Sequence, residues 1–89
     1  MTSPSLPAPY LHLGQGQSVP TERIVAILNP DSAPVRRLLS MAQASGSLVD
    51  ATGGRKARAV VISDPDGVHL AALQPETLVT RYARREVVE

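Results

Sequence analysis

Three basic residues follow two consecutive glycines in the stretch DATGGRKAR, residues 50–58. Glycine permits backbone conformations that other residues rarely adopt, so the chain can turn sharply there and hold the next side chains outward. Such a loop would present Arg55 and Lys56 to phosphate groups, with Arg58 behind them on a strand. The alternative is a solvated turn whose charges only keep the edge of a sheet soluble.

The sequence lacks the motifs of common catalytic and nucleotide-binding sites. The GQG at 14–16 is not a dinucleotide-binding fingerprint, because Val19 stands where the third glycine would be. GGRKAR lacks the GK[ST] pair of a P-loop, and no Gly-x-Ser-x-Gly motif occurs. His12 and His69 have no carboxylate or second histidine at ligand spacing, which favours structural roles for both. We therefore expect no enzymatic activity, cofactor, metal ion or small-molecule substrate.

Composition narrows the class of partner. The 89 residues carry nine Lys and Arg against eight Asp and Glu, so only the distribution of charge could favour nucleic acid. Tyr10 and Tyr82 are the only aromatic residues, whereas proteins that bind single strands normally stack bases on several aromatic rings. There is no cysteine, which excludes disulfides and thiolate sites. Without a signal peptide or a membrane-spanning run, the chain is expected in the cytoplasm, with no membrane contact.

The elements that must position the basic residues are expected in the order β-β-β-α-β-β-β-α. Alternating and β-branched runs predict strands at 10–14, around Ser18, and at 23–28, 48–51, 57–63 and 68–73. The last two strands flank a DPDG turn, which predicts a β-hairpin. One helix is expected after NPDSAP (29–34), and another opens with QPET (74–77).

Each expected helix carries its own boundary and packing signals. For the first, Asp31 or Ser32 is the candidate N-cap, Pro34 lies in the first turn, and Gly46 ends the helix. Its apolar stripe consists of Val35, Leu38, Leu39 and Ala42, with Arg36 and Arg37 outside it. The second helix is expected to bury Leu78, Val79, Tyr82 and Ala83. The cations near its end offset the helix dipole: Arg81, Arg84 and Arg85.

These patterns predict one α+β domain over residues 10–86, built from a small antiparallel sheet and two helices. Residues 1–9 are expected to form a disordered N-terminal extension and 87–89 a tail. The two helices would cover one face of the sheet, yet three of the strands carry apolar residues toward both faces. Because no further segment could cover the second face, we expect a homo-oligomer that shares sheet faces or edges.

Three ordered blocks of the sequence resemble a known family. They read NPDSAPVRRLL at 29–39, LVDATGGRKARAVVI at 48–62 and LQPETLVTR at 73–81. These blocks look like the corresponding segments of the RemA family of bacterial extracellular-matrix regulators, formerly a domain of unknown function. The resemblance runs from about Tyr10 to Arg81. The opening YLHLG is closer to the related RemB branch, and the residues before Tyr10 depart from the family's compact start.

The resemblance implies a subunit fold like that of LytTR-type DNA-binding domains, a closed homo-oligomeric ring, and double-stranded DNA as the partner. It also implies transcriptional activation of biofilm-matrix genes. The family's DNA-contacting arginine in the early loop falls on Arg23, and its basic pair after the glycine falls on Arg55 and Lys56. Lys56 replaces an arginine of the family. A lysine still binds phosphate as a point charge, but it lacks the bidentate fork of arginine.

The leading hypothesis is therefore a homo-oligomeric regulator that binds double-stranded DNA, in which Arg23, Arg55 and Lys56 contact phosphate and Arg58 supports them. A ring would repeat a weak basic patch many times, which gives tight binding without a high net charge. Specificity would come from DNA shape or from spaced repeats in a promoter. The alternative is an oligomeric scaffold that binds another protein, its basic loop serving only solubility; an enzyme ranks third.

Overall fold

A computed structural model describes residues 10–65 and 67–84 of the chain. Within them the strands and helices follow the predicted order, with one short 3-10 helix added. The elements are β1 (Tyr10–Gly14), β2 (Gln17–Pro20), η1 (Thr21–Arg23), β3 (Ile24–Leu28), α1 (Ala33–Ser45), β4 (Leu48–Ala51), β5 (Ala59–Ser63), β6 (Gly67–Ala71) and α2 (Pro75–Arg84). The expectations for residues 1–9, Arg85 and the tail at 87–89 lie outside the described residues.

The strands form two sheets, and the larger one is mixed. Four strands pair in the order β3-β5-β6-β4, while β1 and β2 form a separate antiparallel pair. Strand β5 is antiparallel to both β3 and β6, as the predicted hairpin requires, but β4 runs parallel to β6. The prediction of a purely antiparallel sheet is therefore wrong. The reason is the crossover through α1, which carries the chain from β3 back to the far edge of the sheet and so makes β4 parallel.

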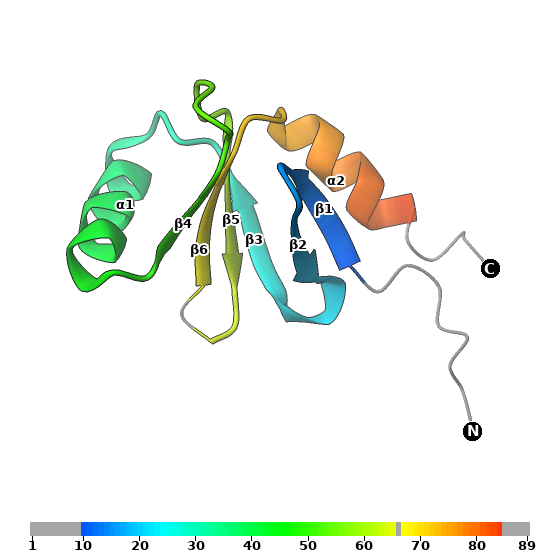
Figure 1. The fold of residues 1–89 in the computed structure, drawn as a ribbon, viewed down its shortest axis with the longest axis horizontal. Helices are drawn as coiled ribbons and strands as arrows, with labels where there is room; N and C mark the ends of the chain where they lie inside the picture. Colours follow the sequence, from blue (N-terminus) through cyan, green and yellow to red (C-terminus); the bar gives the residue numbers. More distant parts are fainter. Residues whose placement is uncertain (1–9, 66, 85–89) are drawn as a thin grey trace.

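The two helices lie on opposite faces of the four-stranded sheet (Figure 1). One core forms under α1 and contains Ala42, Val60 and Val68. The other core lies beneath α2 and the β1–β2 hairpin, and its buried members are Leu11, Leu13, Val19, Ala51, Ala59, Val61, Ala71 and Leu78. The prediction that both helices share one face is wrong, since it overlooked the hairpin as a cover. The argument for self-association from an uncovered sheet face therefore loses its premise.

The boundaries of α1 follow the predicted signals. Ser32 rather than Asp31 is the N-cap, with its hydroxyl accepting a hydrogen bond from the Val35 amide at 3.4 Å. Gly46 ends the helix in a left-handed conformation, φ 78°. The apolar stripe of α1 faces the sheet, whereas Arg36 and Arg37 are exposed.

In α2 only half of the predicted buried stripe is covered. Leu78 is fully buried and Tyr82 is half-buried, but Val79 and Ala83 are exposed. The prediction that Val79 and Ala83 are buried is thus wrong, because α2 lies over the side of the hairpin and only a narrow stripe of the helix meets the core (Figure 1).

Candidate nucleic-acid interface

Residues 52–58, here called the basic loop, connect β4 to β5 through a tight turn. Gly53 and Gly54 have φ values of 65° and 87°, a region that L side chains disfavour. The Arg55 amide donates a hydrogen bond to the Thr52 carbonyl at 3.2 Å, which closes the turn around the two glycines. The predicted role of the glycines is therefore confirmed: they let the chain reverse and release Arg55 outward.

Thr52 anchors this turn to the end of β4. Its hydroxyl donates to Asp50 Oδ1 at 2.6 Å, its amide donates to the same oxygen at 2.8 Å, and the hydroxyl oxygen accepts from the Gly54 amide at 3.3 Å. These bonds from the Thr52 hydroxyl and then its amide lower the pKa of Asp50 below its usual 3.8. The ionised carboxylate thus holds the loop in shape at neutral pH.

The cations of the basic loop are exposed and uncompensated. Arg55, Lys56 and Arg58 all lie on the surface, and no acidic residue occurs in the sequence between Asp50 and Asp64. Among residues 10–65 and 67–84, no side-chain hydrogen bond or ion pair engages these three side chains. Three free cations on a short anchored loop form a patch suited to an anionic partner.

Arg58 is placed differently from the prediction. It was expected on a strand that begins at residue 57, but β5 begins at Ala59. The Arg58 amide donates to the Ala71 carbonyl at 2.8 Å, so its backbone is fixed at the end of β6 while its side chain stays exposed. Arg58 therefore belongs to the loop rather than to the strand behind it.

Arg23 lies at the opposite end of the sheet from the basic loop. It ends η1 rather than starting β3, which corrects the predicted strand boundary, and its carbonyl accepts from the Asp64 amide at 2.8 Å. In the register of the sheet, Ile24 pairs with Ser63, the last residue of β5, whereas the basic loop precedes the first. The five residues of β5 thus separate the two places by about 17 Å. One subunit does not bring Arg23 together with Arg55 and Lys56.

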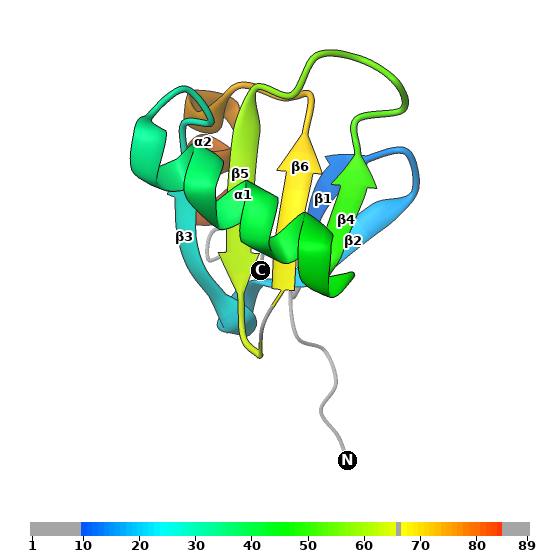
Figure 2. The same cartoon turned by 90° about the vertical axis from the view of Figure 1, so that its left-hand side faces the viewer.

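The turn between β1 and β2 adjoins the basic loop, a neighbour that sequence reasoning missed. A Cβ atom on Gly53 would lie 2.5 Å from Cδ of Gln15, and one on Gly14 would lie 3.8 Å from the Ala51 carbonyl oxygen. Figure 2 shows the turn beside the loop at the edge formed by β4. The sequence marked GQGQ as a turn but carried no signal that it would meet residue 53.

The two histidines have structural surroundings. His12 Nδ1 is 2.8 Å from the Ser18 hydroxyl on the neighbouring strand, and His69 Nε2 is 3.1 Å from the Ser63 hydroxyl. Among the described residues, the buried Nδ1 of His69 has no hydrogen-bond partner, and burial lowers the pKa of this imidazole below its usual 6.5. Within the described part of the chain, no cluster of His, Asp and Glu has the arrangement of a metal site.

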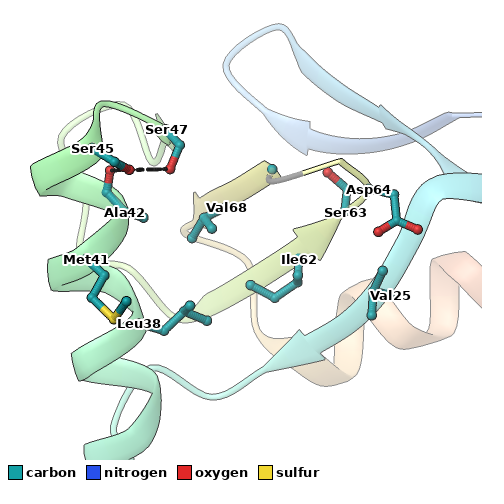
Figure 3. A pocket seen from close by; sticks show the side chains of 11 residues that line it. Val25, Leu38, Met41, Ala42, Ser45, Ser47, Ile62, Ser63, Asp64 and Val68 are labelled. Atoms are coloured by element: carbon teal, nitrogen blue, oxygen red, sulfur yellow. Dashed lines mark hydrogen bonds between the residues drawn. The ribbon is translucent and has the colours of Figure 1, made fainter.

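On the face of the sheet that α1 covers, an apolar groove opens between α1 and strands β3, β5 and β6 (Figure 3). Its volume is about 660 Å³. Met41 of α1 and Val25 of β3 lie at this groove with 64% and 60% of their surfaces exposed. Leu38, Ile62 and Val68 supply the apolar floor (Figure 3). This groove is the place where the cover provided by α1 is incomplete.

Comparison with known proteins identifies the family. Residues 10–82 match the family described as RemA-like, extracellular matrix regulatory protein A-like. This chain belongs to the RemA-like family. Its relatives include proteins named "Putative regulatory protein" in Symbiobacterium thermophilum, 50% identical over 85% of this chain and 80% of the relative, and in Geobacillus kaustophilus, 49% identical over 81% and 83%. One in Heliobacterium modesticaldum is 47% identical over 88% and 86%.

Membership of the RemA-like family confirms the resemblance drawn from the three sequence blocks. The match spans all described strands and nearly all of α2, so the basic loop, the β1–β2 turn and the groove all belong to the family domain. The names of the relatives indicate a regulatory protein rather than an enzyme. No helix in the described residues is both long and apolar enough to cross a membrane.

Proposed function

We propose that this RemA-like protein is a cytoplasmic transcriptional regulator that binds the phosphate backbone of double-stranded DNA through its basic loop. The observation that carries the proposal is the anchored turn of residues 52–55, after which Arg55 and Lys56 are exposed and make no side-chain hydrogen bond or ion pair among the described residues. Phosphate contacts of this kind supply most of the affinity in protein–DNA binding. By family membership, genes of the extracellular matrix are the proposed targets, and the proposed effect is activation.

Self-association into a closed ring forms the second part of the proposal. Support comes from apolar side chains exposed on elements that lie on opposite faces of the sheet. The groove with Val25 and Met41 lies beside α1. Val79 and Tyr10 are at least half exposed, and they belong to α2 and β1, which lie on the other face of the sheet (Figure 1). Two different complementary surfaces give head-to-tail contacts, which close into a ring when the rotation between copies allows it.

A ring would also explain how Arg23 can share a DNA surface with the basic loop. Within one subunit they are separated by the length of β5. To bring them together, an assembly would have to place the end of one subunit that carries Arg23 beside the basic loop of another copy. We propose that each such junction presents Arg55 and Lys56 from one copy with Arg23 from its neighbour.

The test is a DNA-binding titration, by gel shift or fluorescence anisotropy, of the parent protein and of Arg55→Ala. The matched control is Arg37→Ala, which removes the same charge from an exposed position on α1. Arg55→Ala should weaken binding at least about tenfold, since a hydrogen bond between charged groups is worth about 1.5–3 kcal/mol. Arg37→Ala should bind like the parent. Equal binding by all three proteins would show that the basic loop is not the contact.

A second candidate function, an oligomeric scaffold that binds another protein, is favoured only by the apolar groove. In that case the basic loop would serve solubility, and DNA binding would be weak in both Arg55→Ala and the parent. The same titration distinguishes the two, because only true phosphate contacts produce affinity that falls steeply with salt.

A further inference from the structure

The turn between β1 and β2 uses an unusual residue. Gln15 and Gly16 are its two central residues, with φ values of 54° and 76°. A two-residue hairpin loop with positive φ at both positions is normally made from asparagine, aspartate or glycine. A glutamine in this conformation destabilises the turn relative to those residues. The geometry of the turn therefore does not explain why glutamine stands there.

The side chain of Gln15 reaches across to the basic loop. A Cβ atom placed on Gly53 would be 2.5 Å from Cδ, 2.6 Å from Nε2 and 2.8 Å from Cγ of Gln15. Contacts with all three atoms mean that the end of the side chain lies directly against the Gly53 backbone. A side chain at position 53 would have to adopt the disfavoured φ of 65° and would also displace the flexible end of Gln15.

The side-chain amide of Gln15 has no hydrogen-bond partner among the described residues. The residue is also exposed. A glutamine amide offers two donors and one acceptor, and glutamine is among the side chains that donate to DNA phosphates. An unpaired amide next to three free cations has the chemistry of a further phosphate contact.

We propose that the DNA-binding surface extends from the basic loop onto the β1–β2 turn, where the Gln15 amide donates a hydrogen bond to the same DNA backbone. This inference rests on the proposed function. An uncharged donor at this position orients the phosphate without adding to the charge of the patch, so it contributes to geometry rather than to long-range attraction.

The test is to titrate duplex DNA with the parent, Gln15→Glu and Gln43→Glu. Both variants replace an exposed amide by a carboxylate of the same shape, and Gln43 lies on α1, on the other face of the sheet. Gln15→Glu should weaken DNA binding about tenfold or more, because like charges juxtaposed at an interface are costly. Gln43→Glu should bind within about twofold of the parent, as expected for a distant, screened charge. The thermal stability of both variants should match the parent.

Equal losses in Gln15→Glu and Gln43→Glu would overturn the inference, since the effect would then be one of net charge. Parent-like binding by Gln15→Glu, with binding still lost in Arg55→Ala, would overturn the inference and leave the proposed function intact. If Arg55→Ala and the parent bind equally, the proposed function fails and the inference falls with it. Gln15→Gly, which suits the turn, provides a second variant: it should fold at least as stably as the parent and bind DNA more weakly.

Discussion

At the residue scale, Thr52 links the end of β4 to the cations of the basic loop. The Thr52 hydroxyl is buried and joins the Asp50 carboxylate to the Gly54 amide, so a single side chain sets the shape of the turn. Because the turn has this shape, the side chains of Arg55 and Lys56 are exposed. The positions of these two cations were predictable from the sequence, whereas the hydrogen bonds that hold them were not, because nothing in DATGGRK indicates which side chain bonds which amide.

We expect Thr52→Val, which keeps the shape but removes the hydroxyl, to lower the free energy of unfolding by about 1 kcal/mol. That change corresponds to a fall in Tm of about 4–8 °C for a domain of this size. The same variant should bind DNA more weakly, because the loop loses its fixed form. Thr80→Val, at an exposed position of α2, serves as the control. The role assigned to Thr52 fails if the two variants melt at the same temperature.

His69 should make stability depend on pH. Its imidazole lies on β6, where Nδ1 is buried and has no partner among the residues that the structure describes, and burial lowers its pKa below the usual 6.5. The unfolded chain therefore binds the proton more readily, so the free energy of unfolding should fall as the pH drops below about 6.5 and stop falling below the folded pKa. Urea unfolding between pH 7.5 and 5 measures this dependence. His69→Gln should flatten it, and an unchanged slope in that variant would assign the effect to another group.

At the element scale, the sequence predicted which segments form strands and helices better than it predicted how they pair. Alternation and β-branched runs located every strand, and Gly46 and Pro34 marked α1 correctly. Those signals are local. The parallel pairing of β4 with β6 and the placement of the hairpin over the second face depend on contacts between distant segments, which periodicity does not encode. The same limit hid the contact between Gln15 and Gly53.

The contact between the two loops predicts different outcomes for two neighbouring glycines. Gly53→Ala and Gly54→Ala both place a side chain at positive φ, which costs about 1–2 kcal/mol each. Only a Cβ on Gly53 would also meet the Gln15 side chain; one on Gly54 has nothing within 4 Å. Gly53→Ala should therefore destabilise the fold slightly more, by a small amount because the flexible, exposed end of Gln15 can move aside; chemical denaturation measures the difference.

A double variant isolates the cause of that difference. Adding Gln15→Gly to Gly53→Ala removes the obstructing side chain, so the excess destabilisation over Gly54→Ala should disappear. If the excess persists in the double variant, the contact between the β1–β2 turn and the basic loop is not its source.

At the scale of the whole molecule, the proposed ring does not depend on an uncovered sheet face. Both faces of the four-stranded sheet are covered within the chain, but the cover beside α1 is incomplete, and Val79 on α2 and Tyr10 on β1 are exposed. These surfaces differ from each other. Contacts between them would be head-to-tail and would repeat the basic loop at a constant spacing.

Met41→Lys tests the role of the groove. Met41 is exposed on α1, where lysine is a good helix former, so the subunit should fold with a stability change within about 0.5 kcal/mol. A charge in the apolar groove should nevertheless reduce the assembly to smaller species, as measured by light scattering coupled to size exclusion. Gln43→Lys adds the same charge on the same helix outside the groove and should assemble like the parent.

Val25→Lys, on the strand side of the groove, should also reduce the assembly to smaller species, as Met41→Lys does. A parent protein that elutes as a clean monomer would refute the ring.

The salt dependence of DNA binding, measured for the parent and Met41→Lys, shows whether several subunits of a ring contact one duplex. Each phosphate contact contributes about −0.9 to the slope of log K against log salt, so one subunit with its four proposed cations reaches about −3.6 at most. We predict a steeper slope for the parent. For Met41→Lys we predict a shallower slope and weaker binding, even though the added charge alone would favour DNA. A parent slope shallower than about −3.6, or a disassembled Met41→Lys that keeps the parent's affinity and slope, would refute binding by a ring of subunits.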